Sequence, residues 1–222
     1  MTSFRLIEGI LDKAKIDELK GIASAAKFVD GRISNPYSKV KDNLHLHDQE
    51  AYQKTSQIMA QALIGNEEFR DFAFPHQIAP PLMTKYRPGM KYGAHADAAL
   101  MQIGNAMLRS DLSCTLFLND PESYEGGALR IELGDGELRF KGPPGSAIVY
   151  PSTTTHEVEE VASGERLVGL TFIQSQIRDT AKRTLLYELG EVAALEGNNM
   201  SYENYSRLRG VQQNLQRRWS DI

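Results

Sequence analysis

The chain has 222 residues and a mass of 24.8 kDa; 41% of its residues are hydrophobic and 24% are charged. These proportions are ordinary for a globular protein and exclude a collagen, a disordered tail and a coiled coil. The 25 basic and 29 acidic residues give a formal charge of -4, which argues against a dedicated nucleic-acid-binding protein.

Residues 1–77 are predicted to be mainly helical. Asp12 can cap one helix, whose apolar residues recur at spacings of three and four residues, and Asp48 can cap a second helix that ends at Gly65. Between these helices lies an irregular stretch, Asp30–Leu46. We expect both helices to pack on the part of the chain that follows.

Residues 78–177 show a different pattern, in which short β-prone runs alternate with glycine, proline, asparagine and aspartate. The predicted strands are Leu82–Arg87, Leu112–Leu118, Gly127–Leu133, Glu137–Phe140, Ser146–Tyr150, His156–Val161 and Leu167–Gln174. This many short strands within about 100 residues is typical of an antiparallel sandwich or jelly roll. The run Leu112–Leu118 is apolar on both faces, as in a central strand.

Residues 178–222 are predicted to form two helices. Apolar residues recur every four positions from Ile177 to Ala193, and Gly197–Asn199 then interrupts the pattern. Ser201 can cap a last helix that extends to Trp219. Both apolar stripes must pack on another surface. We expect this surface to be the flank of the same barrel, and the alternative is a second subunit.

Two histidines lie in segments that indicate a metal site. His95 and Asp97 form a His-x-Asp motif just after a β-turn. Residues two apart point to the same side of an extended chain, so both side chains can bind one ion. His156 begins a predicted strand after a polar loop, and several strands separate it from Asp97. A sheet that rolls up can therefore bring the three side chains together.

The type of these residues narrows the choice of metal. Two histidines and one carboxylate on one face of an ion form the facial triad of non-haem Fe(II) oxygenases, which leaves coordination positions open. Zinc is the competing ion, because zinc hydrolases also use two histidines and a carboxylate. Those hydrolases commonly carry a helical His-Glu-x-x-His motif, which this sequence lacks. The pattern favours iron and leaves zinc as the alternative.

Arg166 adds a second chemical signal. It follows His156 after one predicted strand and a turn at Ser163-Gly164, which places it deep in the barrel beside the strand of His156. A buried guanidinium requires an anionic partner, and its planar fork matches a carboxylate. A dicarboxylic keto acid that chelates iron at one end would present its other carboxylate to Arg166.

These residues occur in an order that resembles a known family. The series Tyr86-x-Pro-Gly-x-x-Tyr92, His95-x-Asp97, His156 and Arg166 resembles the prolyl 4-hydroxylase-like branch of the Fe(II)/2-oxoglutarate dioxygenases. Within this branch, the chain is similar to bacterial PKHD-type hydroxylases over nearly its whole length. Further matching segments are Phe28–Arg32, Lys41–Asn43, Leu116–Asp120 and Tyr124–Leu129.

The resemblance implies a mainly β fold with flanking helices, built on a double-stranded β-helix (jelly roll) core. It also implies that His95, Asp97 and His156 bind Fe(II), and that Arg166 holds the distal carboxylate of 2-oxoglutarate. Tyr86 is expected either to donate a second hydrogen bond to this cosubstrate or to pack in the barrel. The implied reaction is hydroxylation with release of succinate and CO2, and L-ascorbate is implied as the reductant that keeps the iron ferrous.

These interpretations divide the chain into an N-terminal helical support region (1–77), the dioxygenase core (78–177) and a C-terminal helical appendage (178–222). The expected partners are O2, a small-molecule or peptidyl substrate and, through the C-terminal helices, a second copy of the chain. We expect no nucleic-acid or membrane partner, because the charge is negative and no apolar run is long enough to span a bilayer. A single cysteine, Cys114, and the lack of a signal peptide favour the cytoplasm.

Several residues and one other class of function remain open at this level. His45 and His47 could form a second metal pair, but substrate-loop or surface histidines are the favoured interpretation. Cys114 lies in an apolar run and is expected to be a small core residue. The irregular stretch Asp30–Leu46 and the loop Ala98–Asp111 are candidates for substrate contact. The alternative to an enzyme is a non-catalytic metal- or ligand-binding β-helix module with a partner on the C-terminal helices.

Overall fold

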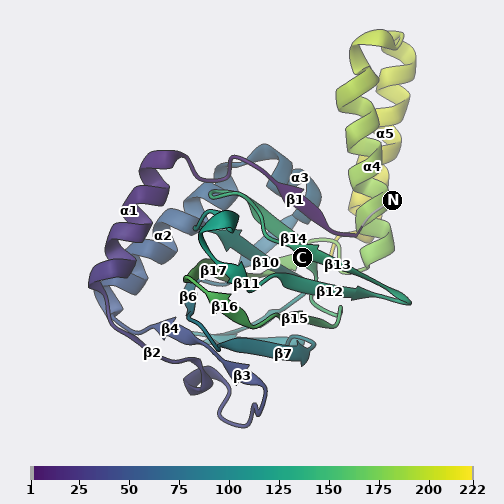
Figure 1. The fold of residues 1–222 in the computed structure, drawn as a ribbon. Helices are drawn as coiled ribbons and strands as arrows, with labels where there is room; N and C mark the ends of the chain where they lie inside the picture. The colour runs from purple at the N-terminus through teal and green to yellow at the C-terminus, as the bar shows by residue number, and fades with distance from the viewer. Residues whose placement is uncertain (1–2, 222) are drawn as a thin grey trace.

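The computed structural model describes residues 3–221. Its helices lie at the two ends of the chain and its strands lie mostly between them (Figure 1). The helices are α1 (Lys13–Ala25), α2 (Gln49–Gly65), α3 (Glu67–Ala73), α4 (Thr180–Glu196) and α5 (Tyr202–Trp219), with short 3-10 turns η1 (Gly31–Ser34), η2 (Pro121–Ser123) and η3 (Gly197–Asn199). Within the described residues, no helix combines the length and the apolar character needed to cross a membrane.

The strands form two main antiparallel sheets. In order across the larger sheet they are β1 (Arg5–Ile7), β14 (Ala147–Pro151), β10 (Leu112–Phe117), β17 (Arg166–Ser175), β6 (Leu82–Tyr86), β4 (Leu44–Leu46) and β2 (Phe28–Asp30), with β5 (Pro75–Ile78) also paired to β17. The smaller sheet contains β13 (Gly136–Phe140), β12 (Leu129–Leu133), β15 (His156–Val158), β7 (Lys91–His95) and β3 (Lys41–Asp42). Two short pairs complete the fold: β8 (Leu100–Ile103) with β9 (Ala106–Arg109), and β11 (Glu125–Gly126) with β16 (Val161–Ser163).

The two sheets enclose a buried apolar cluster, which makes the core the predicted jelly roll. Side chains from both sheets contribute to this cluster: Tyr86, Phe117, Leu129, Ile131, Ile148, Tyr150, Val158, Val161 and Val168. Strand β10 lies centrally in the larger sheet, between β14 and β17, and all six of its residues are buried. This confirms the prediction of a central strand, which is buried on both faces.

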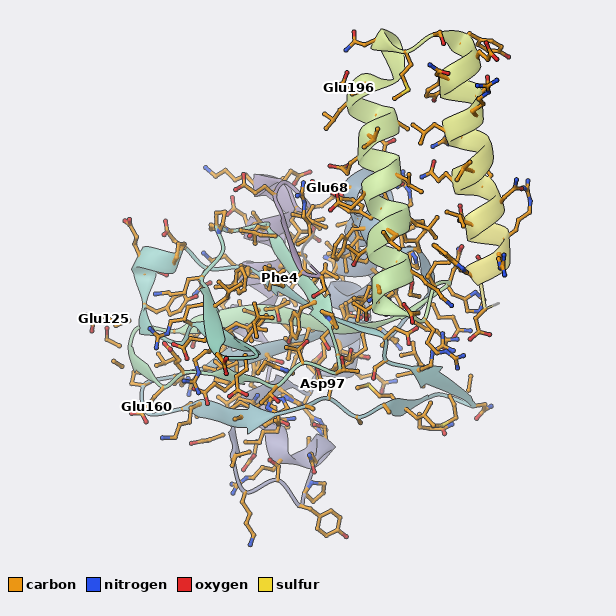
Figure 2. All side chains as sticks on the ribbon, turned by 90° about the vertical axis from the view of Figure 1, so that its right-hand side faces the viewer. Phe4, Glu68, Asp97, Glu125, Glu160 and Glu196 are labelled. Carbon is orange, nitrogen blue, oxygen red and sulfur yellow. The ribbon has the colours of Figure 1, made fainter. Side chains whose placement is uncertain are left out.

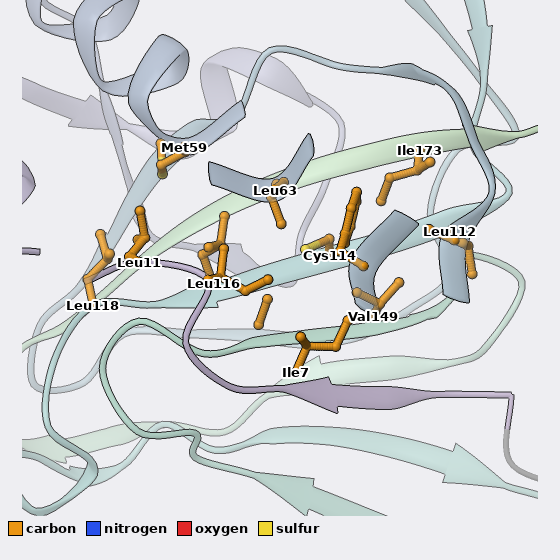
Figure 3. Close-up of a cluster of buried hydrophobic side chains, with 14 of the residues drawn as sticks. Ile7, Leu11, Met59, Leu63, Leu112, Cys114, Leu116, Leu118, Val149 and Ile173 are labelled. Carbon is orange, nitrogen blue, oxygen red and sulfur yellow. The ribbon is translucent and has the colours of Figure 1, made fainter. Parts of the chain in front are cut away.

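A second apolar core lies between the larger sheet and the N-terminal helices. Leu112, Cys114 and Leu116 alternate along β10 and pack with Met59 and Leu63 of α2 (Figure 3). Cys114 is buried, and burial raises the pKa of its thiol, as expected for a core residue and not for a nucleophile. The N-terminal helices thus cover the face of the larger sheet that is turned away from the smaller sheet.

The predicted helix caps are present. Asp12 accepts a hydrogen bond from the backbone N–H of Lys15 and Asp48 accepts one from Ala51, each at 2.8 Å. These bonds satisfy amide groups that a helix start leaves without partners. The sequence does not predict the seven-residue helix α3, because so short a helix shows little periodicity.

The structure corrects two expectations about the irregular segments. The N-terminal region is not only helical, because β1, β2 and β4 extend the larger sheet and β3 extends the smaller one. These strands have two or three residues each, which is too short to show an alternating pattern. The expected loop Ala98–Asp111 contains the hairpin β8–β9, which turns at Gly104 with φ +58°. The Gly-Asn dipeptide at this turn is the sequence signal for the hairpin.

The C-terminal helices pack on the barrel only at their base. Tyr187 of α4 packs edge-on against Phe72 of α3, with ring centroids 5.2 Å apart. Arg183 is buried there and donates a hydrogen bond to the carbonyl of Ile177 at 2.9 Å. Beyond this base, α4 and α5 project from the barrel as a hairpin (Figure 1), and Figure 2 shows Glu196 at its far end, distant from Asp97. The expectation of packing along the barrel flank therefore holds only at this base, where the first turns of α4 and the end of α5 meet the barrel; Arg109 of β9 donates a hydrogen bond to Asp221, just after α5, at 3.0 Å.

Candidate metal centre

The sheet register brings the predicted triad together. His95 is the last residue of β7 and His156 is the first residue of β15, and the two lie opposite each other in the antiparallel pair. Asp97 follows two residues after His95. One of its carboxylate oxygens lies 3.8 Å from Nε2 of His95 and the other lies 3.6 Å from Nε2 of His156. Ligand atoms of all three residues lie within 4.8 Å of one another, so they can share one ion.

Backbone carbonyls orient both imidazole rings. Nδ1 of His95 lies 2.8 Å from the carbonyl oxygen of Gly93, and Nδ1 of His156 lies 2.9 Å from that of Thr154. A carbonyl only accepts hydrogen bonds, so each Nδ1 carries the proton and donates it. In the neutral imidazole, each Nε2 is then the unprotonated nitrogen, and it faces Asp97. This is the tautomer that a metal ion requires.

Aromatic rings enclose the two histidines. Tyr92 stacks on His95, with ring centroids 3.7 Å apart and an interplanar angle of 15°, and Tyr150 meets His156 edge-on at 5.1 Å. Burial lowers the pKa of His95, and the neighbouring His156 lowers it further. A neutral imidazole is the form that binds a metal, so this environment prepares His95 as a ligand.

A pair of serines fixes the third member of the triad. Ser113 of β10 donates a hydrogen bond from Oγ to Oδ2 of Asp97 at 2.6 Å, and Oγ of Ser113 also lies 2.8 Å from Oγ of Ser152. Both serines are buried. This hydrogen bond holds the carboxylate of Asp97 in one orientation. The position of Ser113 in the larger sheet therefore determines which oxygen of Asp97 can reach a metal ion.

Arg166 is the first residue of β17 and lies opposite Tyr86 of β6. Its side chain is 1% exposed, and its guanidinium carbon lies 5.1 Å from the centre of the Tyr86 ring. Among the described residues, none of its three guanidinium nitrogens has a hydrogen-bond partner. A buried charge without a partner is strongly unfavourable, so this geometry fits a ligand that brings a carboxylate.

Tyr86 is also almost fully buried, at 1% exposure. Its hydroxyl accepts a hydrogen bond from Nδ2 of Asn43 at 2.9 Å, which leaves its own O–H free to donate. Burial raises the pKa of Tyr86, so the hydroxyl stays protonated. Asn43 in turn packs against Gly31, where an added Cβ would lie 1.8 Å from Oδ1 of Asn43. The segments Phe28–Arg32 and Lys41–Asn43 therefore meet directly behind Tyr86.

A cavity of about 550 Å³ leads to the triad. The irregular stretch Asp30–Leu46 and the hairpin β8–β9 both contribute to its wall, through Ser34, Asn35, Lys41, Asn43, His45, Leu100, Met101, Gln102 and Ile103. Leu129 and Tyr150 line the same cavity and belong to the buried cluster that includes Tyr86. The triad thus lies between an open cavity and the buried end of the barrel.

Comparison with known proteins agrees with this geometry. Residues 81–174 match the model of the 2OG-Fe(II) oxygenase superfamily. The chain is 54% identical to a PKHD-type hydroxylase of Sphingopyxis alaskensis over 216 residues, covering 97% of this chain and 99% of that one. It is 42% identical to a PKHD-type hydroxylase of Thermosynechococcus vestitus, covering 97% and 98% of the two chains. The chain belongs to the PKHD-type hydroxylase family.

Solved structures support the jelly-roll fold of this PKHD-type hydroxylase. A 2OG-Fe(II) oxygenase-family oxidoreductase from Burkholderia pseudomallei has a TM-score of 0.60 at 14% identity, covering 80% of this chain and 86% of that one. A prolyl 4-hydroxylase from Pseudomonas putida has a TM-score of 0.54 at 20% identity, covering 78% and 92%. Family membership makes the protein an oxygenase that uses Fe(II), 2-oxoglutarate, O2 and a substrate. It favours this class over the zinc hydrolase and the non-catalytic module.

Some residues of the site are not predicted from the sequence. Ser113 belongs to none of the motifs, and the motifs that contain Asn43 and Tyr92 do not by themselves place either residue beside Tyr86 or the triad. Ser113 has a weak signal, because Ser113 and Thr115 are the polar residues on one face of an otherwise apolar strand. Lys41 is also not predicted to be buried. Burial lowers its pKa to about 8, although the negative charges of Asp97 and Asp30 act to raise it.

The hydrogen bond from Ser113 should tune the metal site. We expect Ser113→Ala to weaken Fe(II) binding by about 10–100-fold, because Asp97 loses the donor that orients it. Ser113→Thr retains a hydroxyl and should restore most of the affinity. Anaerobic titration with Fe(II) in the presence of 2-oxoglutarate measures the effect. Equal affinity of Ser113→Ala and the wild type would contradict this role.

The His-x-His segment does not act as a unit. His45 is buried and lines the cavity, whereas His47 is exposed. Neither histidine belongs to the group of three metal-ligand side chains found among the described residues. The structure therefore gives no support to a second metal pair, and it places His45 in the wall of the cavity that leads to the triad.

His45 should make stability depend on pH. Burial lowers its pKa from 6.5 to about 4, so in acid the unfolded chain binds a proton more readily than the folded chain. Above pH 6.5 the two states are both neutral at this residue, and stability is lost as the pH falls from 6.5 towards 4. When the pH is lowered from about 7 to about 5, the unfolding free energy of the wild type should fall by about 2 kcal/mol more than that of His45→Gln, because glutamine does not bind a proton in this range. Urea unfolding measures this, with exposed His47→Gln as the control that should behave like the wild type.

Proposed function

We propose that His95, Asp97 and His156 hold Fe(II), and that the enzyme hydroxylates a small-molecule or peptidyl substrate. The observation that carries this proposal is the convergence of the three side chains, with both Nε2 atoms turned towards one carboxylate. Three protein ligands on one face of the ion leave positions for the cosubstrate and O2. Two nitrogens and one hard oxygen suit ferrous iron.

We further propose that Arg166 and Tyr86 hold the distal carboxylate of 2-oxoglutarate. The guanidinium nitrogens of Arg166 have no partner among the described residues, and a carboxylate would accept from two of them at once. The O–H of Tyr86 is free to donate a further bond because Asn43 supplies the hydrogen that its oxygen accepts. If 2-oxoglutarate places one carboxylate between Arg166 and Tyr86, this group accepts hydrogen bonds from donors that are otherwise buried and without a partner.

The bound iron, with 2-oxoglutarate and O2, supplies the oxidation that converts a C–H bond of the substrate into C–OH with release of succinate and CO2. The protein contributes position and environment. The carbonyls of Gly93 and Thr154 hold the imidazoles, and Ser113 holds Asp97. Tyr92 and Tyr150 shield the histidines from water.

Two measurements test this function. Under anaerobic conditions, Fe(II) with 2-oxoglutarate should give a visible metal-to-ligand charge-transfer band in the wild-type protein. In air, a panel of metabolites and peptides should include members that couple O2 uptake to succinate release. Absence of the band would refute the proposed site. A band without succinate formation would favour a binding module over an enzyme.

The remaining proposals concern the setting of the enzyme. We propose that L-ascorbate keeps the iron ferrous, as the resemblance implies. A cytoplasmic location without nucleic-acid or membrane partners is supported by the formal charge of -4 and by the single cysteine of the sequence. We retain the three functional parts 1–77, 78–177 and 178–222 as a proposal, in which the middle part carries the triad and Arg166.

We also propose a homodimer through the C-terminal helices. The hairpin projects from the barrel, and exposed apolar side chains follow it: Leu185, Val192 and Leu195 on α4, and Tyr202 and Val211 on α5. Burial of such side chains against a second copy would remove them from water. We expect light scattering to give about twice 24.8 kDa for the wild type and 24.8 kDa for Leu195→Glu combined with Val211→Glu. A monomeric wild type, or a dimer in the variant, would contradict the proposal.

A further inference from the structure

Lys41 is a buried cation in the wall of the active-site cavity. It lies on β3, at the edge of the smaller sheet, and is only 9% exposed. Its ammonium donates a hydrogen bond to Oγ of Ser34 at 2.7 Å and lies 5.3 Å from the centre of the Tyr92 ring. An ammonium has three donors, and within residues 3–221 it forms no salt bridge with an acidic side chain.

The nearby acidic groups are already engaged. Asp30 pairs with Arg32, and Asp97 belongs to the candidate metal site. His45 lines the same cavity as Lys41, is 6% exposed, and has a buried Nε2 without a hydrogen-bond partner among the described residues. Lys41 and His45 thus each line the cavity with at least one hydrogen-bonding group that has no partner among the described residues. Buried polar groups of this kind are normally satisfied, so a ligand is the natural partner.

The charges of the loaded site lead to the same conclusion. The double positive charge of Fe(II) and the charge of Arg166 are balanced by Asp97 and by the two carboxylates of 2-oxoglutarate. Lys41 is therefore the surplus positive charge of this cavity. A buried charge without a counter-ion is unfavourable, and one anionic group on the substrate would balance it.

Much of the remaining lining of the cavity is apolar. Leu100, Met101 and Ile103 of the hairpin β8–β9 line it, together with Tyr52 from α2. The cavity thus combines a cationic side chain with an apolar lining, at a volume of about 550 Å³. A ligand with an apolar body and one anionic end matches this combination.

We propose that Lys41, supported by His45, binds an anionic group of the primary substrate, and that this group is a carboxylate on an apolar body. The inference rests on the proposed function, because the charge balance includes iron and 2-oxoglutarate. It names a substrate class for the same cavity: organic acids, including amino-acid and peptide carboxylates. In this arrangement Lys41 is a specificity residue, which holds the substrate while the triad binds the metal.

Matched acid and amide probes test this directly. The probes are phenylacetate, phenylpropionate and phenylbutyrate, each with its carboxamide, and calorimetry measures their binding to the protein loaded with redox-inert Zn(II) and 2-oxoglutarate. We expect at least one acid to bind the wild type about tenfold or more tightly than its amide, as a charge-assisted hydrogen bond predicts. Lys41→Met should abolish this preference, and Lys41→Arg, which keeps the charge, should retain it. Exposed Lys39→Met is the matched control and should behave like the wild type.

Each outcome separates this inference from the proposed function. The anaerobic Fe(II)/2-oxoglutarate band should be unchanged in Lys41→Met, which also shows that the variant is folded. If the band is intact but no acid is preferred over its amide, or if Lys41→Met keeps the preference, the inference fails alone. Loss of the band on addition of an acid would place the acid at Arg166 and would also overturn it. Absence of the band in the wild type would instead refute the proposed function. The comparison of acid with amide in the wild type stands without any variant.

Discussion

Combined replacement of Asp97 and His156 by alanine should reduce Fe(II) affinity by at least about 100-fold, since even residues that only orient metal ligands contribute about 10–100-fold. The double variant leaves His95 as the only ligand of the triad, and one imidazole cannot hold iron in a defined geometry. The charge-transfer band with 2-oxoglutarate should disappear, and succinate formation should fall with it. Metal analysis after desalting gives a readout that does not depend on activity.

The fold should survive this change. Both side chains face the cavity, and neither belongs to the apolar clusters that hold the helices and the sheets together. The matched control combines Asp135→Ala with His76→Ala, the same two chemical changes at exposed positions. It should bind iron like the wild type. Persistence of the band in the double variant at Asp97 and His156 would show that the metal lies elsewhere.

Arg166→Met should have opposite effects on cosubstrate binding and on stability. Loss of the guanidinium removes the partner of the distal carboxylate, and removal of one member of a buried ion pair typically costs about 3–5 kcal/mol. We therefore expect 2-oxoglutarate to bind about 100-fold or more weakly. Iron binding in the absence of 2-oxoglutarate should be unchanged, because Arg166 is not part of the triad.

The ligand-free protein should become more stable on the same substitution. The buried guanidinium has no hydrogen-bond partner among the described residues, so its desolvation is offset only in part, by the Tyr86 ring, until the cosubstrate binds. Methionine fills similar space without a charge, and we expect the unfolding free energy to rise by about 1–3 kcal/mol. Urea unfolding without 2-oxoglutarate measures this, with Arg139→Met on the exposed face of β13 as the control. A destabilised variant that still binds 2-oxoglutarate normally would assign Arg166 a structural role.

The expected contrast gives a reason for a protein to retain a residue that destabilises its ligand-free form. The donors of Arg166 and the free O–H of Tyr86 are held in place before any ligand arrives, so little reorganisation is needed on binding. Ser113 serves the same purpose at the metal, since it fixes Asp97 from a buried strand. In the proposed arrangement, Lys41 extends the pattern to the primary substrate. The site thus concentrates unpaired polar groups where ligands must satisfy them, and apolar packing elsewhere stabilises the fold.

The sequence by itself determined the residue types and their order. The His-x-Asp motif, the distant His156 and the following Arg166 are the donors that iron and a keto diacid require, and this chemistry does not depend on coordinates. Local signals also determined the helix starts at Asp12 and Asp48, since a side-chain cap acts within three residues. The continuous apolar run of the central strand β10 was equally local.

Only the tertiary structure decided which distant residues meet. The register that places His156 opposite His95 depends on the pairing of β15 with β7. Ser113 reaches Asp97, and Lys41 faces the cavity, because separate strands come together around one space. The β3 strand that carries Lys41 has two residues, too few for any periodic signal, and it forms because β7 offers it a partner. Contacts of this kind arise from long-range packing and not from local preference, so spacing along the chain does not reveal them.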